Sequence, residues 1–167
     1  MNNKTLIATL IGFTLIIFVG GIYLAGKSNP PELNNKGNPK VEILGEKTHS
    51  WGEIDIEGGN VEKIFKIRNV GDDPLEVTNF KTSCMCTEAQ ISIGDDTSPA
   101  FGMHTRSGWK GSIQPGETAD IRVVFDPLFH GPQGTGPITR LVSFNTNDSS
   151  NSTVEFRLSG NVVRVEN

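Results

Sequence analysis

The sequence predicts an all-β fold, an antiparallel β-sandwich of about seven strands, preceded by one transmembrane helix. The first 26 residues of this 167-residue chain hold a long uncharged apolar run. After Val41, apolar and polar residues alternate in short runs, which is the period of a β-strand. The 19 glycines and 9 prolines supply the turns that a sandwich of short strands needs.

Residues 5–26 read TLIATLIGFTLIIFVGGIYLAG and carry no charged side chain. About 20 apolar residues suffice for a helix to cross a bilayer, so this run predicts a transmembrane signal-anchor behind a cytoplasmic tail of residues 1–4. A cleaved signal peptide is the alternative, but its apolar region is usually about 7–15 residues long, and Tyr23 gives a poor cleavage motif. We expect a single-pass cell-membrane protein with an extracytoplasmic C-terminal domain, periplasmic or at the cell surface.

A linker is expected between the membrane segment and the folded domain. Residues 27–40 read KSNPPELNNKGNPK, which is rich in Pro and Asn and has no apolar period. This composition predicts a spacer that holds the domain of residues 41–167 away from the membrane.

Seven apolar runs in residues 41–167 have the character of strands. Turn residues such as Gly58-Gly59 and Pro115-Gly116 separate them. The alternation places Phe65, Ile67 and Asn69 on one face of their strand. The expected strands are residues 41–44, 51–56, 61–69, 75–80, 119–125, 138–146 and 154–163.

An ordered series of short motifs runs through residues 45–163. The motifs are Phe65-x-Ile67-x-Asn69-x-Gly71, Pro74-Leu75, Ser83-Cys84-x-Cys86-Thr87, Pro115-Gly116-Glu117, Val124-Phe125-Asp126, Gly136-Pro137, Thr146-Asn147-Asp148 and Leu158-x-Gly160. This series resembles the bacterial DUF1573 family, whose domains are similar to the Ig-like ASPM–SPD-2–Hydin and major sperm protein group. The resemblance implies a seven-stranded Ig-like sandwich, usually exported or membrane-anchored, and it implies no settled activity.

Two features depart from the pattern of that family. The family usually has glycine between its two cysteines, where this chain has Met85. Residues 88–112 also replace a short connection and form an expected enlarged loop. A loop of this size suggests a function, so we predict that it contacts a partner through Phe101 and Trp109.

Cys84 and Cys86 are the only cysteines of the chain, and three roles remain open for them. They are structural residues, reduced or bridged, or they bind a soft metal, or they perform thiol redox chemistry. In an extended strand their Cα atoms would lie about 7 Å apart, so a bridge requires a turn. A redox enzyme usually places Cys-x-x-Cys at a helix N-terminus, and no such helix is expected here. The metal hypothesis is a Cu(I) site of Cys84, Cys86, Met103 and His104, with His49 or His130 as further possible donors.

The net charge of −4 argues against nucleic acid as a partner, because phosphate binding needs a basic surface. We find no pattern of catalytic residues and predict that the protein is not an enzyme. The sequence therefore predicts a membrane-anchored, extracytoplasmic binding or scaffolding module, which binds another extracytoplasmic or membrane protein. A copper-binding or copper-handling domain is the alternative.

Overall fold

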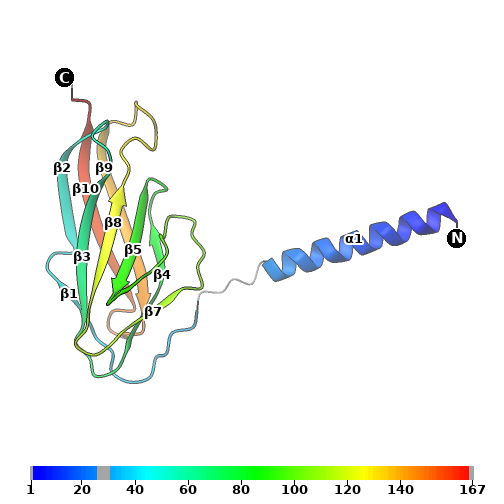
Figure 1. The fold of residues 1–167 in the computed structure, drawn as a ribbon, viewed down its shortest axis with the longest axis horizontal. Coiled ribbons are helices and arrows are strands. Elements are labelled where there is room, and N and C mark those ends of the chain that lie inside the picture. The colour runs from blue at the N-terminus through cyan, green and yellow to red at the C-terminus, as the bar shows by residue number, and fades with distance from the viewer. Residues whose placement is uncertain (1, 26–30, 166–167) are drawn as a thin grey trace.

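The computed structural model describes residues 2–25 and 31–165, which form one helix and a two-layered β-sandwich (Figure 1). Helix α1 spans Asn3–Ala25. The hydroxyls of Thr9 and Thr14 donate hydrogen bonds of 2.9 Å to the carbonyls of Thr5 and Leu10, one turn earlier. Within the described ranges, no helix has the length and apolar character that a membrane span needs, so the predicted transmembrane segment is not confirmed.

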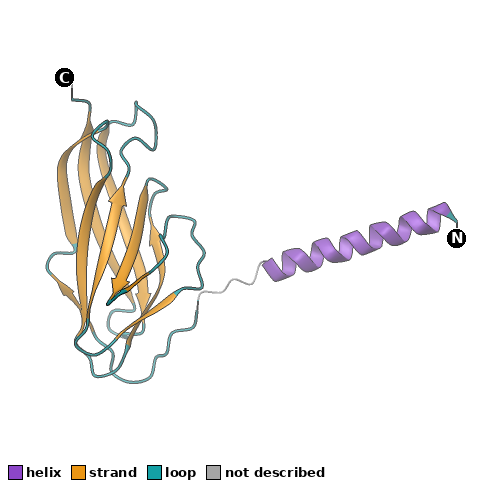
Figure 2. Ribbon diagram, in the orientation of Figure 1, coloured by secondary structure: helices purple, strands orange, loops and turns teal. Residues whose placement is uncertain are grey.

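Residues 31–165 contain ten strands and no helix (Figure 2). All seven expected strands are present. The prediction of a continuous loop over residues 88–112 is wrong, because this stretch contains most of β5 together with β6 and β7. The strands are β1 Val41–Leu44, β2 Thr48–Asp55, β3 Val61–Asn69, β4 Leu75–Thr82, β5 Thr87–Ile93, β6 Asp96–Thr97, β7 Lys110–Ile113, β8 Thr118–Phe125, β9 Gly136–Thr146 and β10 Thr153–Val163.

The strands form two sheets of five. One has the order β1-β3-β8-β5-β6 and the other the order β2-β10-β9-β4-β7. Neighbouring strands are antiparallel with one exception: β2 runs parallel to β10, so the prediction of an entirely antiparallel sandwich is wrong at this edge. The chain passes from the second sheet to the first between β4 and β5, and both cysteines lie in this connection.

The core lies between the two sheets and is rich in stacked aromatic rings. Phe80 stacks on Phe144 and Phe101 with ring centroids 4.6 and 5.1 Å away, and Phe65 stacks on Phe156 at 4.2 Å. Phe65, Ile67 and Asn69 are all buried, as the alternation predicted. A separate small cluster closes one end of the sandwich and consists of Ile54, Ile56, Cys86, Phe125 and Val162.

Residues 31–40 of the expected linker lie against the sandwich, whereas residues 27–30 are outside the described ranges. The backbone NH of Asn34 donates to the Glu76 carboxylate at 2.6 Å, and the Asn147 side chain donates to the Asn34 carbonyl at 2.8 Å. The backbone NH of Asn38 donates to the Asp73 carboxylate at 2.7 Å. The last part of this segment is therefore attached to the domain and does not act as a free spacer.

Candidate functional site

The turn between β4 and β5 brings the two cysteines together. The backbone NH of Thr87 donates to the Cys84 carbonyl at 3.2 Å, and the Thr82 hydroxyl donates to the same carbonyl at 2.9 Å. These bonds fold the chain back on itself, so the Cα atoms of Cys84 and Cys86 are 5.3 Å apart and the residues form a disulfide. The sequence left open whether the two cysteines are reduced or bridged. In the structure they are bridged, and they lie in a turn of the kind that such a bridge requires.

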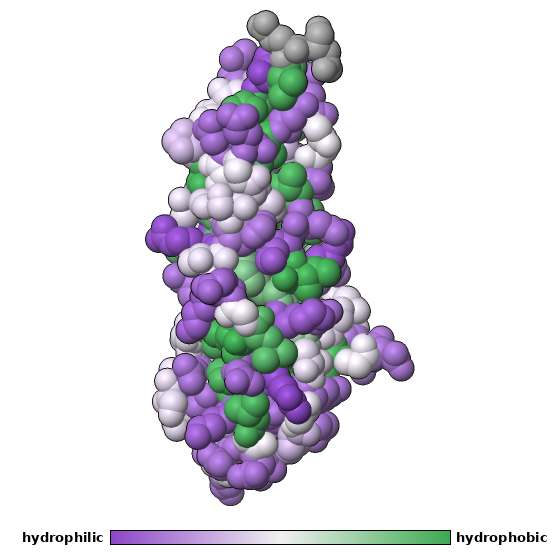
Figure 3. Space-filling model, turned by 90° about the vertical axis from the view of Figure 1, so that its left-hand side faces the viewer, coloured by the Kyte–Doolittle hydropathy of each residue, from purple (hydrophilic) through white to green (hydrophobic). Residues whose placement is uncertain are grey.

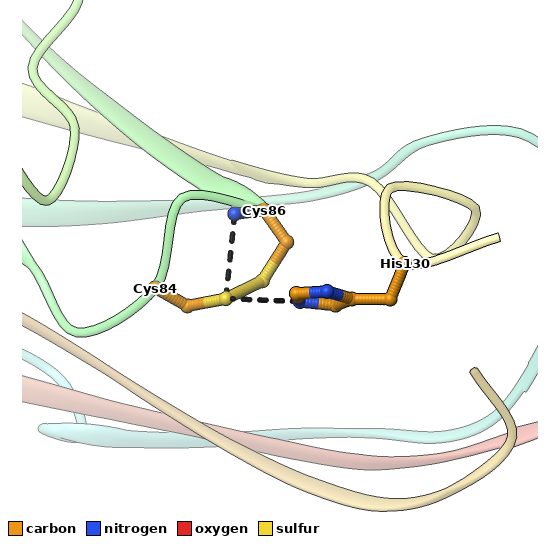
Figure 4. Close-up of side chains that lie close together, drawn as sticks. All are labelled: Cys84, Cys86 and His130. Carbon is orange, nitrogen blue, oxygen red and sulfur yellow. Dashed lines mark hydrogen bonds between the residues drawn. A yellow bond between two sulfur atoms is a disulfide. The ribbon is translucent and has the colours of Figure 1, made fainter.

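Two basic side chains lie against the two sulfur atoms, one against each. Nε2 of His130, in the loop after β8, is 3.5 Å from Sγ of Cys84 (Figure 4). Nε of Arg140, on β9, donates to Sγ of Cys86 at 3.1 Å. The two sulfurs also differ in access, because Cys86 is buried within the end cluster while Cys84 is only half-buried.

The half-buried Arg140 guanidinium is held against the end of the core. It lies over the Phe125 ring, 5.3 Å from the ring centroid, and it donates to the Thr139 carbonyl at 2.9 Å. Burial lowers the pKa of Arg140 below its usual value, because desolvation disfavours the charged form. The usual arginine pKa is so high that the group stays charged at neutral pH. Among the ion pairs of the described residues, none involves Arg140, so its charge is not neutralised by a carboxylate.

The disulfide contributes little to the stability of the fold. A bridge stabilises mainly by restricting the unfolded chain, and the effect grows with the length of the closed loop. Cys84 and Cys86 are two positions apart. The chain-entropy relation then gives about 1.5 kcal/mol, compared with about 3 kcal/mol for a 15-residue loop. Stability alone is therefore a weak reason for this bridge.

The structure does not assemble the four residues of the predicted copper site. In the described part of the chain, the one cluster of His, Cys or acidic side chains that could hold an ion is Cys84, Cys86 and His130, whose ligand atoms lie within 4.8 Å of one another. His104 is not in this cluster. Met103 and His104 line a different hollow of about 240 Å³, together with Met85. The spacing along the sequence could not show that the loop after β8, and not the longer loop before β7, reaches the sulfurs.

The predicted partner anchors belong to the core. Phe101 is only 2% exposed, and its backbone NH and carbonyl pair with those of Ala89 at 2.8 and 2.9 Å. Trp109 is half-buried, and its ring packs against Phe80 and Phe101. The prediction that Phe101 is a contact residue is therefore wrong, because the loop folds back over the sandwich and inserts this ring.

Large apolar side chains are exposed around the disulfide instead. Met85, Leu128 and Phe129 are 56%, 48% and 45% exposed, and we call these three residues the disulfide-end patch. Met85 and Phe129 line an open hollow of about 280 Å³ beside Cys86. The Phe129 ring also packs edge-on against the His130 ring, with centroids 5.2 Å apart. Sequence reasoning missed Leu128 and Phe129, although two adjacent large apolar residues in a loop were a readable signal.

One side of the molecule can be compared with this end. The side of the molecule on the left of Figure 1, where β1 and β2 lie, is mainly hydrophilic with separate hydrophobic spots (Figure 3). Ile64 on β3 is as exposed as Phe129, at 46%, but its pairing partner across the sheet is Arg122 of β8. It is therefore a suitable reference for an exposed apolar residue outside the patch.

Residues 43–95 match the model of DUF1573, described as a protein of unknown function. This match confirms the resemblance seen in the sequence motifs, and the fold is a two-sheet β-sandwich as implied, with ten strands where the resemblance implied seven. No curated protein sequence matches the chain.

Two solved structures are similar to the chain. A protein of unknown function from Porphyromonas gingivalis W83 is 20% identical with a TM-score of 0.57, over 77% of this chain and 49% of that one. The chain thus spans about half the length of that protein. The ASH / PapD-like domain 7 of human CEP192 is 16% identical with a TM-score of 0.48, over 83% of this chain and 94% of that one. At 20% identity the similarity to the first of these structures concerns the fold and not the function.

Proposed function

We propose that the domain is a binding or scaffolding module, and not an enzyme, which contacts another protein through the disulfide-end patch. The observation that carries this proposal is the exposure of Met85 and Phe129 on the rim of the hollow beside Cys86. Burial of one such side chain against a partner is worth about 1.5–3 kcal/mol. Methionine adapts its shape to different partners, and a ring beside it supplies a rigid anchor.

We propose further that this contact takes place outside the cytoplasm. The disulfide supports this placement, because such bridges persist in oxidising compartments and are rare in the cytosol. The uncharged run of residues 5–26 supports export and a membrane anchor by its composition alone. Membrane fractionation after alkaline washing, with N-terminal sequencing of the mature chain, separates an anchor from a cleaved signal. Release of a chain that lacks residues 5–26 would exclude the anchor.

Photo-crosslinking in intact cells tests the contact surface. A photoreactive phenylalanine analogue replaces Phe129 in one variant and Ile64 in the matched control. We expect a discrete crosslinked species from position 129, weakened by the additional change Met85→Ser, and none from position 64. Equal crosslinking from both positions, or crosslinking from 64 alone, contradicts the proposal.

Soft-metal binding remains the second candidate function, in a changed form. The cluster of Cys84, Cys86 and His130 offers two sulfurs and one nitrogen, a set that suits Cu(I) once the disulfide is reduced. Competition of the reduced, anaerobic protein with a Cu(I) chelator tests it. We expect weaker binding for Cys84→Ser/Cys86→Ser and for His130→Ala, and no change for His104→Ala. Equal competition by the wild type and the double cysteine variant would eliminate copper binding.

A further inference from the structure

The Cys84–Cys86 disulfide has the surroundings of a reactive bond and not only of a structural one. It closes a very short loop, one of its sulfurs is accessible, and the other touches a guanidinium. We propose that this disulfide exchanges with thiols of a partner polypeptide, accepting two electrons and oxidising a pair of partner cysteines. The exchange itself goes beyond the binding role and can be measured on the isolated protein, whereas the preference for a polypeptide thiol rests on the contact surface of the proposed function.

Access decides which sulfur is attacked. Cys86 is 3% exposed and belongs to the end cluster, whereas Cys84 is half-buried and faces His130, an exposed residue. A thiolate approaches a disulfide through the sulfur that it can reach. Attack on Sγ of Cys84 therefore forms the mixed disulfide at Cys84 and releases Cys86.

Charge favours the same direction. Exchange is faster when the leaving sulfur is stabilised as a thiolate. Sγ of Cys86 already accepts a hydrogen bond from Nε of Arg140 at 3.1 Å, and the Thr87 hydroxyl lies 3.7 Å from the same sulfur. Because none of the ion pairs among the described residues involves Arg140, its charge is not shared with a carboxylate and acts on the leaving group. Arg140 touches a reacting atom and so acts directly on the exchange, which consumes the disulfide once and leaves the domain a stoichiometric oxidant and not an enzyme.

The exchange balances in two steps. A first partner thiol loses its proton to solvent and attacks Sγ of Cys84 as a thiolate, so a bond forms between these two sulfurs. The Cys84–Cys86 bond breaks, and its electron pair moves to Sγ of Cys86, beside Arg140. A second partner thiolate then attacks the partner sulfur of the mixed disulfide, and Cys84 leaves with the electron pair and takes up a proton from solvent. The products are a partner disulfide and the reduced cysteine pair.

The partner thiol is expected to belong to a polypeptide with apolar residues beside its cysteines. Met85, the residue between the two cysteines, and Phe129, next to His130, provide exposed apolar surface, and both line the hollow beside the disulfide that Cys86 also lines. A small hydrophilic thiol would gain nothing from this surface. A polypeptide thiol and a small hydrophilic thiol can therefore be distinguished by the rate at which each reduces the disulfide.

Stopped alkylation followed by intact-mass measurement of the full-length purified protein tests the proposal. The probes are glutathione and two synthetic dicysteine peptides, one flanked by leucines and one by aspartates. We expect the leucine peptide to react fastest, and Arg140→Gln to slow its reaction by about tenfold or more, because a hydrogen bond to a charged group is lost. Arg140→Lys restores part of the rate, and Arg157→Gln, an exposed arginine on the neighbouring strand β10, leaves it unchanged.

Trapping identifies the attacked sulfur. With Cys86→Ser the leucine peptide, supplied as an activated mixed disulfide, is expected to couple to Cys84, and with Cys84→Ser to couple much more slowly to Cys86. Circular dichroism of every variant establishes that it is folded, and a folded Arg140→Gln protein that reacts at the wild-type rate overturns the proposal. Preferred coupling at Cys86 overturns the assignment of Cys84 as the attacked sulfur. Equal rates with all three probes overturn the proposal of a polypeptide partner.

Discussion

The change Phe101→Ala distinguishes a core residue from a surface anchor. The Phe101 ring is 2% exposed and stacks on Phe80 with centroids 5.1 Å apart. Removal of a buried phenylalanine side chain costs about 3–5 kcal/mol, which combines the lost transfer free energy with the cavity that remains. We therefore expect the free energy of unfolding of the full-length protein to fall by about 3–5 kcal/mol.

Urea unfolding followed by tryptophan fluorescence measures this loss, because Trp109 packs against Phe101 and reports the same region. The matched control is Met103→Ala in the same loop, where the side chain is 44% exposed and the expected change is within about 0.5 kcal/mol. A Phe101→Ala protein within about 0.5 kcal/mol of the wild type would refute the reasoning, because a ring inserted in the core cannot be removed at so small a cost.

Three further predictions concern the turns that hold the sandwich together. Asn69→Ala removes a buried amide that donates to the Ile113 carbonyl at 2.8 Å and accepts from the Gly71 NH at 2.9 Å. Urea unfolding should show that the free energy of unfolding falls by about 2–4 kcal/mol, and no fall would contradict this role. Gly71→Ala places a methyl group against the backbone carbonyl oxygen of Asn38. We therefore expect a lower thermal midpoint than for Gly45→Ala, where the backbone has a positive φ but the added carbon meets no neighbouring atom. Equal midpoints would be inconsistent with the close approach of Gly71 to Asn38. Burial raises the pKa of Asp148, but hydrogen bonds from Asn151 and from backbone NH groups outweigh it and hold the pKa below its usual value. The stability from Asp148 is therefore present above its unfolded pKa of about 3.9 and is lost as the pH falls through the folded value, so Asp148→Asn should flatten the acid limb of stability against pH, and an unchanged limb would refute this.

Much of the fold follows from local patterns in the sequence. The alternation in residues 61–69 and 119–125 fixes which side chains face the core, and both segments are strands with the expected buried faces. The short strands in the region after Cys86 were missed for a physical reason. Lys110–Ile113 has only four residues, and two of them are Gly111 and Ser112, so its strand character comes from pairing with β4 and not from its own propensity.

The candidate site depends on contacts that local patterns do not reveal. His130 is 46 positions from Cys84, and Arg140 is 54 positions from Cys86, so only the completed sandwich brings these groups to the sulfurs. Met103 and His104 are nearer to the cysteines along the sequence, but in the structure they line a different hollow. Soft donor atoms in a long loop therefore suggested a metal site whose residues the fold separates.

Trapping of a partner in the cell envelope tests the central claim most directly, that the disulfide end meets its partner and exchanges thiols with it. In the Cys86→Ser chain the Cys84 thiolate attacks the disulfide form of the partner, releases one partner thiol and stays linked, because Cys86 can no longer resolve the adduct. Cells that express this chain are quenched with an alkylating agent, and the chain is purified and analysed without reductant. We expect a partner polypeptide linked through Cys84, which dithiothreitol releases. This adduct should be absent with Cys84→Ser and less abundant with Phe129→Ser. The absence of any reducible adduct, or an adduct that forms equally in the Cys84→Ser chain, would contradict it.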